Sequence, residues 1–139
     1  MKSTMLAACA ALMLALAPAG AAEPEGAEAA RAVIQSQLDA FDREAVDEAY
    51  EYAAPTIQRM FPTPGIFGEM VQRGYPMVWD PADTEFLDAE PRGDGSLIQR
   101  LRLVDKAGRP FIAEYRMEMI DGEWRIAGVQ IVEDRSIGA

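Results

Sequence analysis

The residues that could do chemistry in this chain are carboxylates, tyrosines and arginines. The sequence has no histidine, no asparagine and a single cysteine, Cys9. Ser-His-Asp and Cys-His nucleophile systems are therefore excluded, as are zinc, copper and haem sites built on histidine or cysteine. N-glycosylation is excluded as well, because its acceptor is asparagine. We expect no metal and no other cofactor.

Two polar residues interrupt the apolar face that we expect for the C-terminal strands. Gln99 and Tyr115 are predicted to lie directly opposite each other, on a face that also carries Met117 and Trp124. One interpretation is a pocket in which this pair orients a small ligand between apolar walls. The other is a filled core in which the two buried polar groups form hydrogen bonds. The filled core explains the pattern without any ligand.

A second group of candidate residues lies where the helical half of the chain meets the strands. Segment 73–79 carries an arginine and two aromatic rings, which could line the mouth of a pocket if the segment is a loop. Alternatively, the rings pack under the sheet edge and the arginine lies near a helix C-terminus, where a cation is stabilising. With Tyr50 from an earlier apolar stripe, the candidate ligand-binding residues are Gln99, Tyr115, Arg73, Tyr75, Trp79, Tyr50, Met117 and Trp124.

Charged residues alternate along the opposite face of the same strands. They could bind an anion, but opposite charges that face each other across strands are typical of the solvated face of an antiparallel sheet. Asp80, Asp83 and Glu85 are close in sequence but lack the spacing of a calcium-binding loop. We therefore interpret both groups as solvated surface.

The N-terminal half has apolar residues at helical spacing. The pattern predicts helices over 28–41 and 44–54, a further turn over 56–61, and a third helix that begins at Pro64. Thr63 would cap that helix with its hydroxyl, and Gly74 would suit its C-terminal cap. After Pro76 the period shortens from about 3.6 residues to about 2, which predicts strands over 84–89, 97–105, 109–120 and 123–132.

The strand pairing can be predicted from the alternation of polar and apolar residues, because paired strands must place their polar side chains on the same face. Asp121-Gly122 is typical of a two-residue hairpin loop. A three-residue loop over 106–108 places Arg100 opposite Glu114 and Gln99 opposite Tyr115, whereas a longer loop would turn the polar faces inward. A change of phase at Ala127-Gly128 indicates a β-bulge. The resulting fold class is α+β, with N-terminal helices packed on a curved antiparallel sheet of about four strands.

Several motifs resemble a known family. The run from Asp121 to Ile126 is similar to the last hairpin of NTF2-like (SnoaL-like, cystatin-like) domains. The Ala-Ala-Pro run at 53–55, the segment 70–76 and the final strand resemble the bacterial exported family called domain of unknown function 4864. The resemblance covers roughly residues 30–133 and implies an NTF2-like cone and a periplasmic location. It supplies no catalytic residues.

The N-terminus has the organisation of a cleavable signal peptide. Lys2 precedes an apolar run from Met5 to Ala17, and residues 19–21 form a small-residue cleavage site. Cys9 follows a lipobox-like run, but the apolar stretch continues beyond it, which argues against lipidation. We expect a signal peptide over 1–21 cleaved near Ala21-Ala22, a lead-in over 22–27, one domain over 28–135 and a tail over 136–139.

The net charge and the length of the apolar runs exclude two kinds of partner for the protein that we expect to be exported. Loss of Lys2 with the leader would take the formal net charge from −10 to −11, so a nucleic acid backbone would be repelled. No later apolar run reaches the about 20 residues that cross a membrane. We expect a periplasmic monomer or homodimer.

Three functions remain open. The first is non-enzymatic binding of a small apolar or amphipathic ligand, or of a protein, in or around the cone. The second is a small hydrolase, isomerase or dehydratase that uses a carboxylate with Tyr115. The third is a structural module that dimerises through its outer sheet face. A cavity that holds an acidic group beside Tyr115 would favour the enzyme, and a filled cone would favour the structural role.

Overall fold

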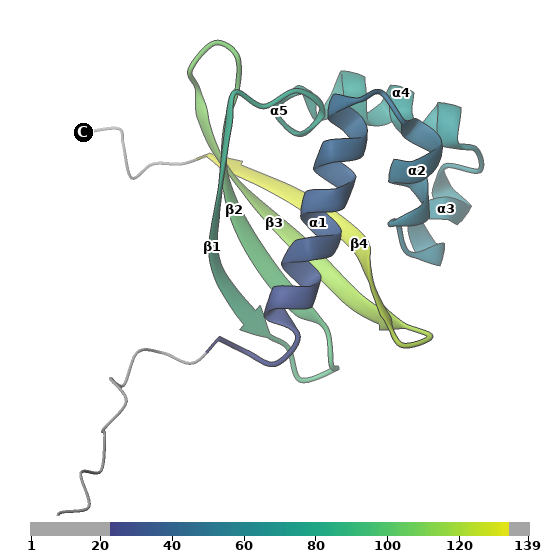
Figure 1. Ribbon diagram of the computed structural model, residues 1–139, viewed down its shortest axis with the longest axis vertical. Coiled ribbons are helices and arrows are strands. Elements are labelled where there is room, and N and C mark those ends of the chain that lie inside the picture. Colours follow the sequence, from purple (N-terminus) through teal and green to yellow (C-terminus); the bar gives the residue numbers. More distant parts are fainter. Residues whose placement is uncertain (1–22, 134–139) are drawn as a thin grey trace, which may run out of the picture.

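The structure, a computed structural model, describes residues 23–133 and begins with one long amphipathic helix, α1 (Ala27–Asp42). Its apolar stripe is buried, and the helix lies across the inner face of the sheet, against β2 and β4 (Figure 1). Gly26 precedes it with a φ of 83°, and a Cβ there would lie 2.6 Å from the Trp124 ring. Only glycine therefore allows Trp124 to pack over the start of α1.

Four shorter helices follow: α2 (Val46–Glu51), α3 (Pro55–Met60), α4 (Pro64–Gly74) and α5 (Pro76–Trp79). The helix predicted over 44–54 is confirmed as α2 but is shorter at both ends, and after its C-terminal end residues 52–54 pair with strand β4 instead. Ile126 donates its N–H to the Tyr52 carbonyl and accepts from the Ala54 N–H, both at 2.8 Å. These long-range hydrogen bonds take the place of the last helical turn.

The end of α4 also differs from the prediction, although its start does not. Thr63 caps the helix as expected, accepting from the Ile66 N–H at 3.2 Å. Gly74 does not adopt the left-handed cap conformation; it is the last residue of α4, and Tyr75 still donates to Val71 at 2.8 Å. Pro76 then begins α5, so most of segment 73–79 is helical and not the expected loop.

The strands form one antiparallel sheet in the order β1 (Asp83–Pro91), β2 (Leu97–Val104), β3 (Pro110–Ile120) and β4 (Glu123–Glu133). The predicted register is confirmed: Gln99 pairs with Tyr115, and the hairpin at 121–122 has positive φ at both positions. The bulge is confirmed too, since Ala127 is the extra residue between the pairs of Ile126 and Gly128. Together these elements make the α+β fold that the pattern predicts.

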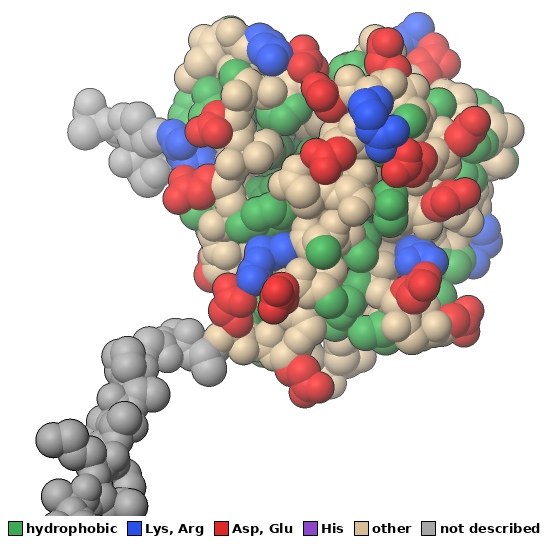
Figure 2. Space-filling view, viewed as in Figure 1, with side chains coloured by type: hydrophobic (Ala, Val, Ile, Leu, Met, Phe, Trp, Pro, Cys, Tyr) green, Lys and Arg blue, Asp and Glu red, His purple; other side chains and the backbone are tan. Residues whose placement is uncertain are grey.

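The outer sheet face is charged and internally paired. Arg100 lies within 2.7–3.0 Å of three carboxylates, those of Asp88, Glu90 and Glu114. These ion pairs favour the solvated-face interpretation over an anion site. Figure 2 shows the opposite side of the molecule, that of α1, where acidic and basic side chains are also interspersed. Among the helices of the described chain, none is long and apolar enough to cross a membrane.

Candidate functional site

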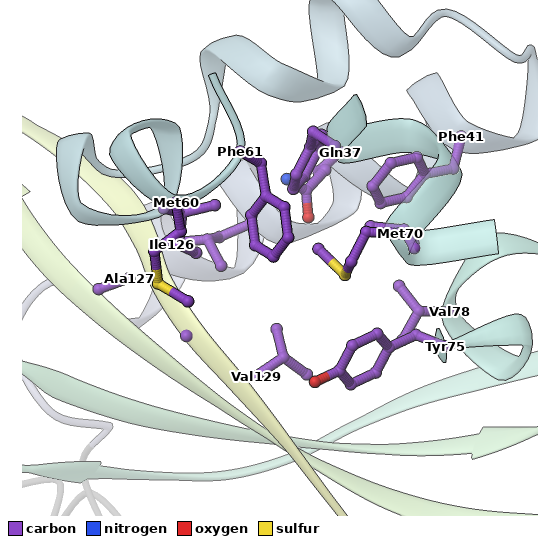
Figure 3. A pocket seen from close by; sticks show the side chains of 14 residues that line it. Gln37, Phe41, Met60, Phe61, Met70, Tyr75, Val78, Ile126, Ala127 and Val129 are labelled. Carbon is purple, nitrogen blue, oxygen red and sulfur yellow. The ribbon is translucent and has the colours of Figure 1, made fainter. Parts of the chain in front are cut away.

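An apolar pocket of about 230 Å³ lies between the helices and the bulged part of β4 (Figure 3). Its walls come from α1, from α3 with the residue after it, from α4, from segment 75–78 and from residues 126–129 of β4. Among its fourteen lining residues, only Gln37 and Tyr75 have polar side chains, and none is charged. The site can therefore hold an apolar molecule and offers few groups for chemistry.

Helix α3 forms one side of the pocket through Ile57 and Met60. This helix has no buried residue and contacts β4 next to the bridge at Ile126. The bulge at Ala127 interrupts the alternation of β4, so Ile126 and Val129 both face the helices with two residues between them. Space remains between this stretch of strand and the helices that face it.

Gln37 supplies the first polar group of the pocket. Its side chain is buried in the stripe of α1, with 3% of the residue exposed. Its Nε2 donates to the Ala49 carbonyl of α2 at 3.0 Å. The amide oxygen faces the pocket between Phe61 and Phe41, and no described residue donates to it (Figure 3).

Tyr75 supplies the second polar group, on the opposite wall. Its ring extends from the junction of α4 and α5, and its hydroxyl lies beside Val129 of β4 (Figure 3). Between these two groups the walls are aromatic and aliphatic, with the thioether of Met70 at the centre of the α4 side. Met60 stands at the outside with 70% of the residue exposed.

Tyr50 fixes the outer wall of the pocket without lining it. Its hydroxyl donates to the carbonyl of Phe61 at 2.7 Å and lies 3.2 Å from that of Gln58. Gln58 returns a hydrogen bond from its Nε2 to the Tyr50 carbonyl at 3.0 Å. The Tyr50 ring also packs on Phe67 of α4, with ring centroids 5.5 Å apart. These contacts position α3 and Phe61.

Of the residues predicted from the sequence around segment 73–79, the structure brings only Tyr75 into the pocket. Trp79 packs on Phe41 from outside the lining, with ring centroids 5.5 Å apart. Arg73 points to solvent, with its side chain 79% exposed, and forms an ion pair with Glu69 one turn earlier in α4. Trp124 covers the start of α1 and is separate from the pocket.

The pair on the strands lies in the filled core under α1. Gln99, Tyr115 and Met117 are fully buried, and none of them lines the pocket. Gln99 donates through Nε2 to backbone carbonyls, including that of Leu87 at 3.1 Å. Its amide oxygen and the Tyr115 hydroxyl have no hydrogen-bond partner among the described residues. Burial raises the pKa of Tyr115 above its usual value of about 10, so the phenol stays protonated at neutral pH.

Gln37, Phe61 and Met70 were missed by the sequence reasoning. For Gln37 a signal existed, because it follows Ile34 by three residues and precedes Leu38 on the buried stripe. A glutamine at such a position is a buried polar group that needs an explanation. For Phe61 no periodic signal existed, since its segment lies between Pro55 and Pro62.

Comparison with known proteins adds a family but no activity. A sequence model described as Domain of unknown function (DUF4864) matches residues 23–139. The chain belongs to this family. The DUF4864 match covers every described residue, which confirms the family resemblance seen in segments 53–55 and 70–76. A comparison with curated proteins gives no match.

The DUF4864 domain has no evident metal centre in its described part. No group of three or more His, Cys, Asp or Glu side chains lies close enough to hold an ion within residues 23–133. Asp80, Asp83 and Glu85 therefore form no such group. The pocket between α1, α3, α4 and β4 is the feature from which we argue a function.

Proposed function

We propose that this DUF4864 protein is an exported, non-enzymatic domain that binds a small apolar or amphipathic ligand in the pocket beside β4. The observation that carries the proposal is the lining, which is apolar except for Gln37 and Tyr75. A concave apolar site with a few convergent polar groups is the usual form of a small-molecule site. The proposal places the ligand away from the strand face of Gln99 and Tyr115, which was one candidate site from the sequence.

The size of the pocket limits the ligand. At about 230 Å³ it is smaller than the roughly 300–1,000 Å³ of drug-sized sites. It is larger than an engineered cavity of about 150 Å³ that binds benzene. A molecule with one or two fused rings, or a short alkyl chain, fits this range.

The same lining argues against the enzymatic alternative. A carboxylate paired with Tyr115 would need both groups at one accessible site. The pocket is lined by no acidic side chain, and Tyr115 lies outside it with a protonated phenol. Binding without turnover accounts for the lining better than the hydrolase, isomerase or dehydratase does.

Export and an NTF2-like cone complete the proposal. Residues 1–21 contain a lysine, then an apolar run, then a small-residue cleavage site. This order is typical of a signal peptide and supports secretion to the periplasm. The order of helices followed by an antiparallel meander is similar to that of NTF2-like domains. A soluble carrier or sensor of small apolar molecules is consistent with both.

The test is to fill the pocket and measure binding of 2-naphthol by the emission of its ring. Met70→Trp places a large ring in the centre of the pocket, and we expect affinity to fall at least about tenfold because the ligand and the ring compete for one volume. Ile66→Trp is the matched control, since Ile66 is on the same helix but is 49% exposed and does not line the pocket. It should bind as the unmodified protein does.

Two results would contradict the proposal. One is the absence of any 2-naphthol binding by the unmodified protein, and the other is equal affinity in the two tryptophan variants. Val129→Leu fills less of the pocket and is the second test variant if Met70→Trp does not fold. It should lower affinity in the same direction and leave the midpoint of thermal unfolding nearly unchanged.

A further inference from the structure

We infer that the pocket selects an uncharged ligand that donates a hydrogen bond, from an O–H or N–H group, to the Oε1 atom of Gln37. The inference rests on the proposed binding function and adds the chemical class of the ligand. It follows from three features of the site: the fixed orientation of the Gln37 amide, the position of its oxygen on the pocket wall with no donor among the described residues, and the absence of charge in the lining.

The orientation of the Gln37 amide follows from its partner. The Ala49 carbonyl can only accept a hydrogen bond, so the atom 3.0 Å from it is the nitrogen of the amide. A flipped amide would place two acceptors against each other. The oxygen must therefore face the pocket, as Figure 3 shows. The pocket presents an acceptor at this wall.

The oxygen of Gln37 becomes buried only when a ligand occupies the pocket, which makes a donor on the ligand important. A ligand that fills the pocket removes water from the Gln37 oxygen, and no described residue can replace the lost hydrogen bond. A buried acceptor without a partner costs free energy, which a hydrocarbon ligand would have to offset from its own burial. A hydroxyl or N–H group on the ligand restores the hydrogen bond.

The lining excludes ionised ligands. None of the lining side chains is charged, so a carboxylate would find no cation and an ammonium would find no anion. Burying an unpaired charge is more costly than burying a neutral polar group. A carboxylate would also face the Gln37 oxygen, which repels it. Alcohols, phenols and indole-like N–H compounds remain.

Tyr75 does not alter this selection. Its hydroxyl can donate or accept, so it can satisfy either kind of polar group on the far side of the ligand. The Gln37 atom that faces the pocket is the amide oxygen, which only accepts, so Gln37 is the group that discriminates.

The experiment compares the affinities of naphthalene and three of its derivatives for the purified mature protein at neutral pH. We expect 2-naphthol, which is neutral and has a donor, to bind about three- to tenfold more tightly than naphthalene. The 2-methoxy derivative, which accepts but cannot donate, should bind no better than naphthalene. The 2-carboxylate should bind most weakly.

A variant assigns the selectivity to Gln37. Gln37→Met keeps the length and apolar volume of the side chain and removes the acceptor, so 2-naphthol should lose its advantage while naphthalene binds as well or better. Gln35→Met is the matched control on the same helix, because Gln35 is exposed and bonds to Asp39. It should leave the order of affinities unchanged.

The outcomes separate this inference from the proposed function. If all four compounds fail to bind, the binding function itself is wrong. If they bind, but with equal affinity or with the carboxylate preferred, the pocket is a ligand site and the role of Gln37 is wrong. The ligand series needs no variant, so instability of Gln37→Met would not leave the question open.

Discussion

Two polar side chains, those of Tyr115 and Gln99, are buried in the otherwise apolar core of this protein. Tyr115 and Gln99 lie opposite each other on β3 and β2, and both are fully buried. Each has one oxygen without a hydrogen-bond partner in the described part of the chain. Such an atom has lost its hydration on folding and gained nothing in return, so it lowers the free energy of unfolding.

The Tyr115 hydroxyl should therefore be dispensable for stability. Tyr115→Phe keeps the ring and removes the unpaired oxygen, and we expect the free energy of unfolding to rise by roughly 1 kcal/mol. Thermal unfolding measures this as a rise of several degrees in the midpoint. Tyr75→Phe is the control, because its hydroxyl faces the pocket, and it should change little. A fall in the Tyr115→Phe midpoint would mean that the hydroxyl is hydrogen-bonded in solution.

Among the secondary-structure elements, α3 is the one whose position depends on polar contacts. It has no fully buried residue, and its apolar packing is limited to partly buried side chains such as Ile57. Its neighbours are the bridge between residues 52–54 and Ile126, and the hydrogen bonds of Tyr50 to the carbonyls of Gln58 and Phe61. Because α3 forms the outer wall of the pocket, these contacts also position that wall.

Removing the Tyr50 hydroxyl should loosen α3. In Tyr50→Phe we expect the free energy of unfolding to fall by about 1 kcal/mol, the usual net value of one hydrogen bond. We also expect faster tryptic cleavage after Arg59, which is exposed within α3. Tyr52→Phe is the matched control, since no hydrogen bond of its hydroxyl exists within the described structure. Equal cleavage rates in both variants would contradict the role of Tyr50.

At the scale of the whole molecule, the net charge is consistent with the export that we propose. The chain carries a formal net charge of −10, and its basic side chains are largely paired with carboxylates on the surface. A protein with a large net charge stays soluble at high concentration. That property suits a domain that we propose to work as a free periplasmic binder.

Export can be tested on the full-length chain expressed in a Gram-negative bacterium. We expect the periplasmic fraction to contain a soluble protein that begins at Ala22, identified by its intact mass. Cys9→Ser should give the same product, because Cys9 would leave with the leader. Leu14→Arg should prevent export by interrupting the apolar run. A membrane-bound product with a lipid on Cys9 would overturn the proposal.

Local rules account for the parts of the fold that could be predicted. Two features determine which residues face each other: the hairpin geometry at 121–122 and the alternation of side chains on either side of the 106–108 loop. Both are properties of short segments. The bulge at Ala127 follows from the same alternation. The predictions failed at two places. Residues 52–54 leave the helix because they pair with β4, and Gly74 does not end α4 in the left-handed conformation because Pro76 begins α5 directly afterwards.

The sequence by itself determined the fold class, the strand register, the bulge and the list of excluded chemistries, because each depends on residue types or on neighbours close along the chain. Only the tertiary structure decided which polar groups face a cavity. Gln37, Tyr75 and Val129 are separated by dozens of residues. They meet because the segment before α3 pairs with β4 at Ile126, and a pocket remains between the helices and this part of the strand. Tyr115, one of the candidates from the sequence, is buried in the filled core because α1 covers the centre of the sheet.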